Sequence, residues 1–402
     1  MTVWTFEDCE LDTDRYELRR AGAAVAVEPQ VFDVLAHLVA NRDRVVDKHE
    51  LLDAVWHTRF VTESTLTSRI KAARRAIGDD GRTQRLIRTV HGRGYRFVAD
   101  AADVPADAAP PRPDGPDHEP VPDQRIGFCT APDGVRIAYA TVGAGDGRPL
   151  VKAANWLTNL RHDWTSVVWR HWLRDLSAER SLVLYDERGC GMSDWDVADV
   201  SFDARVRDLE TVVDALGLER FPLLGISQGG AVAAAYTARH PGRVTHLVLY
   251  GAFPLGRDAR ARSDDERRDA AMMLELLETG WGREGSPFAS MFASQFMPRG
   301  TPDQWAAFVD LQRTTTSTRN ALRLMRESAH FDVTDVAPRI DVPTLVLHAR
   351  HDHRIPLEQG ELFAALVPGA RFVALESHNH ILLDGEPAWA VFVDEVRRFL
   401  SR

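Results

Sequence analysis

A proline-rich segment divides this chain of 402 residues into two parts that we expect to fold separately. Seven prolines fall within the 24 residues 101–124, among aspartates and alanines and with almost no large apolar side chains. Such a stretch cannot build a hydrophobic core and is typical of an extended spacer. The sequence therefore predicts a first domain at residues 1–100, a linker at 101–124 and a second domain at 125–402.

The two parts differ in their charge. The whole chain has a net charge of −10, which by itself argues against nucleic acid as a partner. Residues 59–98, however, carry ten Lys and Arg against three Asp and Glu, and residues 1–100 balance at sixteen of each sign. The acidic excess therefore lies beyond the first domain. The basic segment is a candidate surface for DNA phosphates, although a solvated helix face has a similar composition.

Periodicity in the first part predicts short strands over 3–27, helices near 31–39, 51–56 and 62–77, and a hairpin of strands 86–90 and 95–98. Thr62 is the expected N-cap of the third helix, and Gly78 ends it. The face of this helix opposite its apolar stripe carries Ser64, Ser68, Lys71 and Arg75, flanked by Thr67 and Arg74. Cations and small hydroxyls on one face suit entry into a major groove. The hairpin loop presents Arg93 between two glycines, where it can reach a minor groove.

Four runs of sequence in this part together resemble the OmpR/PhoB-type winged helix, namely residues 27–35, 45–56, 68–75 and 87–95. The resemblance implies a winged helix-turn-helix domain of α+β class that binds double-stranded DNA. It implies that the third helix reads the major groove through Ser68, Lys71, Arg74 and Arg75, and that Arg93 acts from the wing. We expect no receiver domain before the winged helix, so the resemblance does not imply control by phospho-relay. A winged helix used only for protein contacts is the alternative.

Beyond residue 125 the pattern changes to short apolar runs that alternate with helical stretches. The runs lie at residues 150–153, 182–185, 222–226, 244–250 and 344–348. Buried strands alternating with helices indicate a mostly parallel sheet of α/β class. Residues 252–340 break this rhythm with a mostly helical segment rich in Met, Phe and Trp. We expect a helical cap insertion there, covering the catalytic edge of the sheet and shaping an apolar pocket.

A G-x-S-x-G pattern occurs between a predicted strand and a small-residue helix, as Gly225-Ile226-Ser227-Gln228-Gly229. This strand–turn–helix context is the one that a nucleophilic serine requires. A serine hydroxyl needs a base and a carboxylate that orients the base. Asp352 and His380 follow late strands in the expected order of serine, acid and histidine. His378 competes with His380, but His380 directly precedes an apolar turn, which favours it.

This second part is similar to the α/β-hydrolase superfamily, and residues 185–194 further resemble its D-x-R-G-x-G-x-S stretch. The resemblance implies a catalytic triad of Ser227, Asp352 and His380, and no cofactor. It implies an oxyanion hole made by the backbone N–H groups of Gln228 and Trp156. The His-Gly pair usual in the family is replaced here by Ala154-Asn155-Trp156, which puts efficient catalysis in question. Six residues could suggest a metal site, but two triad loops explain their clustering, so we expect no metal: His348, His351, Asp352, His353, His378 and His380.

The overall composition of the chain bears on its cellular compartment and on its partners. The chain has three widely spaced cysteines and no apolar run of 18 or more residues, and we expect no signal peptide, because residues 1–8 lack its basic and apolar regions. We therefore expect a soluble, cytoplasmic protein with no membrane partner, and a homodimer is possible. Three functions are compatible with the sequence. The first is a transcription regulator whose hydrolase domain senses, and can also hydrolyse, a small apolar ester-like ligand. The second is a serine esterase with an autoregulatory DNA-binding domain, and the third is a scaffold without either activity.

Overall fold

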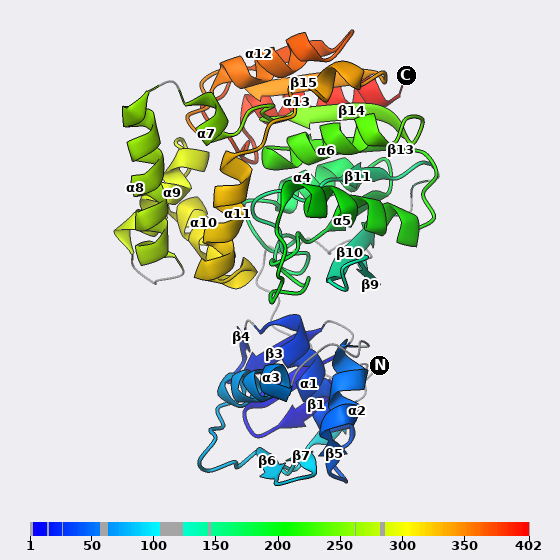
Figure 1. Cartoon of the computed structure of the whole chain (residues 1–402), viewed down its shortest axis with the longest axis vertical. Helices are drawn as coiled ribbons and strands as arrows, with labels where there is room; N and C mark the ends of the chain where they lie inside the picture. Colours follow the sequence, from blue (N-terminus) through cyan, green and yellow to red (C-terminus); the bar gives the residue numbers. More distant parts are fainter. Residues whose placement is uncertain are drawn as a thin grey trace. The chain divides into compact units, whose positions relative to one another are not determined.

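The computed structural model describes residues 3–13, 16–25, 27–56, 63–104, 124–143, 145, 147–261, 263–281 and 286–401 (Figure 1). The described residues form two compact units, one up to residue 104 and one from residue 124. Most of the predicted linker lies outside the described residues. No helix in the described ranges is both long enough and apolar enough to cross a membrane.

The first unit begins with an antiparallel sheet of five strands. Their order is β4 (Ala23–Val25), β3 (Glu17–Arg20), β2 (Cys9–Asp12), β1 (Val3–Phe6) and β8 (Ala102–Val104). Strand β8 corrects the predicted start of the linker, because residues 102–104 pair with Val3, Trp4 and Thr5. This pairing covers an edge of β1 that would otherwise expose unpaired backbone groups.

Three helices and a second small sheet complete this unit. The helices are α1 (Pro29–Ala40), α2 (Lys48–Trp56) and α3 (Glu63–Ala76), and their apolar faces share one core with Phe6 and Phe97. The small sheet has the order β5 (Val46–Asp47), β7 (Gly94–Phe97), β6 (Ile87–Val90). The predicted hairpin is therefore present, and the winged-helix fold is confirmed. The predicted N-cap Thr62 lies outside the described residues.

The second unit is built on a sheet of eight strands in the order β16-β15-β14-β13-β11-β12-β10-β9. Only β10 runs antiparallel to the others among these strands. The strand bounds are β9 Gln124–Thr130, β10 Arg136–Val142, β11 Leu150–Lys152, β12 Leu182–Tyr185, β13 Phe221–Ile226, β14 Val244–Tyr250, β15 Thr344–Ala349 and β16 Arg371–Leu375. The five predicted apolar runs form strands within one residue of their expected bounds. Strands β9 and β10 were missed. Strand β9 has no buried position, and β10 mixes buried with half-buried positions, so neither shows the fully buried pattern of the central strands.

Helices cover both faces of this sheet. Residues of α5 (Phe202–Ala215), α6 (Gln228–Arg239) and α12 (Leu357–Leu366) share one core with the central strands. Helices α4 (Arg170–Ser177) and α13 (Pro387–Leu400) contact each other through the Trp389 indole N–H, which donates to Asp175 Oδ2 at 2.7 Å. This arrangement confirms the predicted α/β-hydrolase fold.

A helical insertion lies between β14 and β15, where a cap was predicted. It consists of α7 (Arg257–Arg260), α8 (Asp264–Gly280), α9 (Pro287–Phe296), α10 (Pro302–Thr315) and α11 (Thr318–Ala329). Figure 1 shows these helices gathered at one side of the sheet, apart from the helices that cover its faces. A short 3-10 helix, η2 (Ala337–Arg339), leads back to β15.

Candidate functional site

Ser227 occupies the sharp turn between β13 and α6. Its backbone has φ 53° and ψ −127°, a conformation that side-chain-bearing residues rarely adopt. The glycines of the motif make the turn possible. A Cβ atom added at Gly229 would lie 2.6 Å from the Ala154 carbonyl oxygen, and one added at Gly225 would lie 2.6 Å from the Gly230 Cα. Local backbone packing therefore explains why the G-x-S-x-G pattern surrounds an outward-facing serine.

The structure brings the three predicted triad residues together. His380 Nε2 lies 3.0 Å from Ser227 Oγ, and His380 Nδ1 lies 2.6 Å from Asp352 Oδ2. All three side chains are buried. The Asp352 carboxylate also accepts hydrogen bonds from the backbone N–H groups of Arg354 and Ile355, at 2.8 and 2.9 Å. A hydroxyl, an imidazole and a fixed carboxylate in this order can perform nucleophilic catalysis.

Electrostatics keep the Asp352 carboxylate ionised. Burial alone would raise the pKa of Asp352, but the neighbouring His380 ring and the backbone donor Ile355 outweigh it and hold this pKa below its ordinary value. His348 Nε2 lies 3.7 Å from the same carboxylate and is hydrogen-bonded to the Ile355 carbonyl at 2.9 Å. The negative charge of Asp352 is therefore available to stabilise a positively charged His380.

His378 does not share this position. Its ring stacks on His351 at a centroid distance of 4.6 Å and lies 6.3 Å from His353. The backbone N–H of His380, in contrast, donates to the Phe296 carbonyl of the cap at 2.8 Å, which anchors the histidine loop. Within the described ranges, no group of three or more His, Cys, Asp or Glu residues is arranged to hold a metal ion.

The two residues predicted to form the oxyanion hole border the same pocket as Ser227. Gln228 is the first residue of α6, where backbone N–H groups have no partner within the helix. Trp156 belongs to the loop after β11, and its carbonyl accepts a hydrogen bond from Asn155 Nδ2 at 3.1 Å. Lys152 Nζ in turn donates to Asn155 Oδ1, and burial lowers the pKa of Lys152 to about 8. The role of the Trp156 N–H group stays a prediction.

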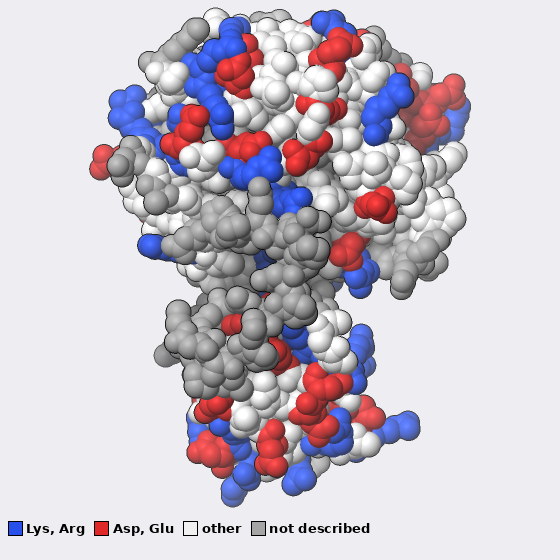
Figure 2. Space-filling model, turned by 180° about the vertical axis from the view of Figure 1, so that it is seen from behind, with Lys and Arg blue, Asp and Glu red and all other residues white. Residues whose placement is uncertain are grey.

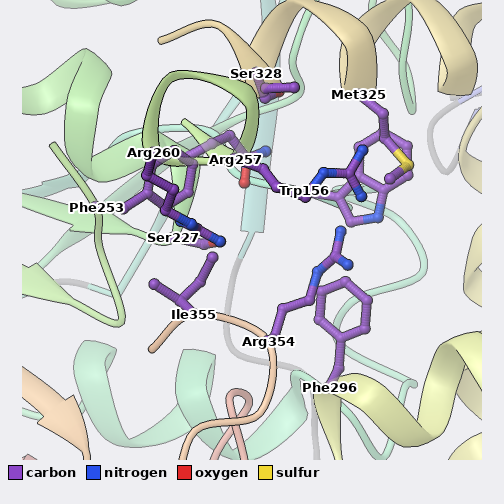
Figure 3. A pocket seen from close by; sticks show the side chains of 12 residues that line it. Trp156, Ser227, Phe253, Arg257, Arg260, Phe296, Met325, Ser328, Arg354 and Ile355 are labelled. Carbon is purple, nitrogen blue, oxygen red and sulfur yellow. The ribbon is translucent and has the colours of Figure 1, made fainter. Parts of the chain in front are cut away.

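The Ser227 pocket has a cavity volume of about 80 Å³ (Figure 3). Its walls are formed by residues of the sheet edge and of the cap: Trp156, Ser227, Gln228, Phe253, Arg257, Arg260, Phe296, Met325, Ser328, Ala329, Arg354 and Ile355. Most aromatic side chains of the cap segment, residues 252–340, do not line this pocket. Trp281 and Phe288, for example, pack against Phe292 at centroid distances of 6.5 and 6.0 Å.

Three arginines in this pocket were missed by the sequence analysis, which expected apolar walls. Arg257 and Arg260 belong to α7, and Arg354 follows Asp352 by two residues. The sequence contained a signal for these arginines. Arg257 and Arg260 follow the carboxyl end of β14, and Arg354 follows that of β15, so all three come from the sheet edge where the triad loops also lie.

The predicted DNA-contacting residues lie on α3 and on the wing formed by β6 and β7. Ser68, Lys71, Arg75 and Arg93 are exposed. Within the described residues, the side chains of Lys71, Arg75 and Arg93 form no hydrogen bond or ion pair. Figure 2 shows basic side chains at the end of this unit where Figure 1 has the β6–β7 hairpin. These cations are therefore available to phosphates.

Arg74 is a correction to the predicted DNA-binding set. Its side chain is only 8 % exposed. Its Nη2 donates to the Ile87 carbonyl at 2.8 Å and to Thr89 Oγ1 at 2.9 Å, and its Nε donates to the same carbonyl at 3.1 Å. The guanidinium group therefore holds β6 against α3 and does not face a ligand. Helical spacing alone placed it at the margin of the exposed face, where tertiary packing decides its direction.

Comparison with known families agrees with both halves of this description. A family model for the alpha/beta hydrolase fold matches residues 162–387, more than half of the chain, so the chain belongs to this family. A second family model, described as the C-terminal part of transcriptional regulatory proteins, matches residues 22–97. The chain thus combines a DNA-binding regulatory domain with an α/β-hydrolase domain.

Individual relatives match the hydrolase part. The chain is 28 % identical over 264 residues to a non-heme chloroperoxidase of Kitasatospora aureofaciens, covering 63 % of this chain and 91 % of the relative. It is 25 % identical over 249 residues to the pyrrolizixenacetamide deacetylase of Xenorhabdus hominickii, covering 60 % of this chain and 87 % of the relative. Among solved structures, an esterase from Exiguobacterium antarcticum superposes with a TM-score of 0.57 at 23 % identity, over 68 % of this chain and 99 % of the esterase.

Proposed function

We propose that this protein is a transcriptional regulator whose hydrolase domain binds a small ester or related acyl compound and can hydrolyse it. The hydrogen-bonded chain from Ser227 through His380 to Asp352 carries the proposal, because it stands in one polypeptide with a DNA-binding regulatory domain. Relatives named as a deacetylase and an esterase support acyl chemistry at this site.

In the proposed mechanism, His380 Nε2 takes the proton of Ser227 Oγ as this oxygen attacks the substrate carbonyl carbon. Asp352 orients the imidazole and stabilises its positive charge. The backbone N–H groups of Gln228 and Trp156 donate to the oxyanion of the tetrahedral intermediate. His380 then gives the proton to the leaving alcohol as its C–O bond breaks. Water, activated by His380, hydrolyses the acyl-enzyme and restores Ser227.

For DNA binding, we propose that α3 enters the major groove and that the wing contacts the minor groove or backbone. Lys71, Arg75 and Arg93 supply the cations, and Ser68 lets the helix approach closely. Ligand binding is proposed to change DNA affinity, and a coupling of about 1–3 kcal/mol would suffice for regulation.

The triad geometry also favours a second function, that of a serine esterase whose DNA-binding domain controls its own synthesis. The hydrogen bonds from His380 to Ser227 and Asp352 support turnover, which a binding-only sensor does not need. The two functions differ in what the regulatory signal is. A sensor responds to occupancy of the pocket, whereas an enzyme changes the concentration of its substrate.

Fluorescence anisotropy of the full chain on duplex DNA from its own promoter region tests the proposal. A set of short 4-nitrophenyl esters serves as ligands, and hydrolysis of each is followed in parallel by absorbance. We expect affinity for DNA to shift with at least one ester that is also bound or hydrolysed. Ser227→Ala should retain the shift if occupancy is the signal and lose it if turnover is. A bound ester that leaves DNA affinity unchanged in both proteins would remove the sensor function.

A further inference from the structure

Three guanidinium groups line the Ser227 pocket, and no carboxylate does among the described residues. Figure 3 shows Arg260 reaching toward Ser227, and Arg257 and Arg354 ending beside Trp156. On the triad side, the Asp352 carboxylate is hydrogen-bonded to His380 through Oδ2. The pocket thus concentrates positive charge beside the proposed nucleophile.

Neutral groups hold these arginines. Arg354 Nη1 donates to Gln295 Oε1 at 3.2 Å, and its guanidinium lies 4.9 Å from the Phe296 ring centroid. Arg257 Nη2 donates to the Ala270 carbonyl at 3.2 Å, and Arg260 Nη1 to the Leu255 carbonyl at 3.4 Å. Among the described residues, Arg260 and Arg354 have no ion pair, and Arg257 has one long ion pair, from Nε to Asp258 Oδ1 at 3.7 Å. These contacts orient the three cations and leave Arg260 and Arg354 without an ionic partner.

The positive charge of this site favours the binding of an anion. Burial, with the charges of Arg257 and Arg260, lowers the pKa of Arg354 to about 10. Arg257 and Arg260 also border an adjoining pocket that carries Glu266, Asp269 and Glu358, whereas the lining of the Ser227 pocket contains no acid. Like charges held together in a partly buried site cost free energy, and a bound anion offsets that cost.

The shape of the guanidinium group points to the kind of anion. It is planar and presents a rigid fork of N–H donors. Carboxylate oxygens match this fork, because they can accept two parallel hydrogen bonds from one guanidinium group.

We propose that the Ser227 pocket selects an ester or lactone that carries a carboxylate, with the carboxylate on Arg257, Arg260 and Arg354 and the acyl carbonyl at Ser227. This inference rests on the proposed acyl hydrolysis and names its substrate class. Phe253, Met325 and Ile355 contact the hydrocarbon part between the two groups. The ligand is therefore amphiphilic, in contrast to the apolar ligand expected from the sequence.

Matched substrates test the proposal on the full chain. The half-ester 4-nitrophenyl hydrogen adipate carries a carboxylate, whereas 4-nitrophenyl methyl adipate is neutral and nearly the same size. We expect kcat/KM to be about tenfold or more higher for the charged ester, since hydrogen bonds to a charged group are strong. Arg354→Met and Arg257→Met should each bring the ratio of the two values closer to one.

The matched control is Arg267→Met, which removes an exposed cap arginine paired with Asp264 and should leave the ratio unchanged. A wild-type ratio of one or less, or a ratio that neither pocket variant changes, overturns the proposal while leaving acyl hydrolysis intact. If neither ester is hydrolysed, the proposed hydrolysis fails instead. Calorimetric titration then decides the anion site. Binding of adipate but not of dimethyl adipate, weakened in Arg354→Met, supports it, and no binding of adipate overturns it.

Discussion

His380 Nε2 lies within hydrogen-bonding distance of Ser227 Oγ, at 3.0 Å, although 153 positions separate the two residues in the sequence. The turn after β13 presents the serine, and the loop after β16 presents the histidine. A parallel sheet brings these loops to one edge, and the Phe296 carbonyl of the cap fixes the histidine backbone. Catalysis at this site therefore depends on the sheet and on the cap together.

Substitution of each histidine in the loop after β16 distinguishes the catalytic base from a histidine that only packs there. His380→Ala should reduce kcat for 4-nitrophenyl acetate by about 10²–10⁴-fold, because Ser227 loses its base. His378→Ala is the matched control and should leave kcat unchanged, since its ring stacks on His351. Steady-state absorbance measures both. Equal loss in the two variants would contradict the assignment of the base.

Gly229→Ala tests the oxyanion loop. The new Cβ would lie 2.6 Å from the Ala154 carbonyl oxygen and push the loop that bears Trp156 away from α6. We expect kcat to fall by about 10²–10³-fold, the effect of losing one oxyanion donor. Gly147→Ala, at a position with open space, is the control. Thermal unfolding of both variants distinguishes local displacement from loss of the fold.

We expect the arginines of the winged-helix domain to have two different roles, contact with DNA and packing within the domain. Arg93→Ala and Arg75→Ala should weaken binding to duplex DNA and reduce its salt dependence, and Arg75→Ala should also relax sequence preference by about 1–3 kcal/mol. Arg74→Ala should instead lower the free energy of unfolding by about 1–3 kcal/mol, because the buried Ile87 carbonyl loses its donor. Anisotropy over a salt series and urea unfolding measure the two effects. An Arg74→Ala protein of normal stability that binds DNA poorly would reverse this division.

Asp79 makes the stability of the first unit depend on pH. Burial alone would raise the pKa of Asp79, but backbone N–H donors from Ile87, Leu86 and Arg85 outweigh it and lower this pKa. A carboxyl group whose pKa is lower in the folded than in the unfolded state stabilises the fold at pH values above its unfolded pKa of about 3.9. This stabilisation is lost as the pH falls through the pKa of the folded state. Asp79→Asn should therefore destabilise the unit at pH 7 and have a smaller effect below about pH 4. The measurement is hydrogen exchange of the Leu86 and Ile87 amides in the wild-type and Asp79→Asn proteins, at pH 7 and below about pH 4. An equal loss of protection at both pH values would contradict the prediction.

The sequence by itself determined which two folds the chain adopts, and it singled out Ser227, Asp352 and His380. Local patterns carry that information, because strand runs, helix periodicity and the G-x-S-x-G turn depend on neighbours in the chain. Only the tertiary structure turned Arg74 into the protein, paired residues 102–104 with β1 and gathered Arg257, Arg260 and Arg354 around Ser227. These outcomes depend on contacts between distant segments, since the direction of a long side chain follows from the space and the hydrogen-bond partners that packing leaves to it.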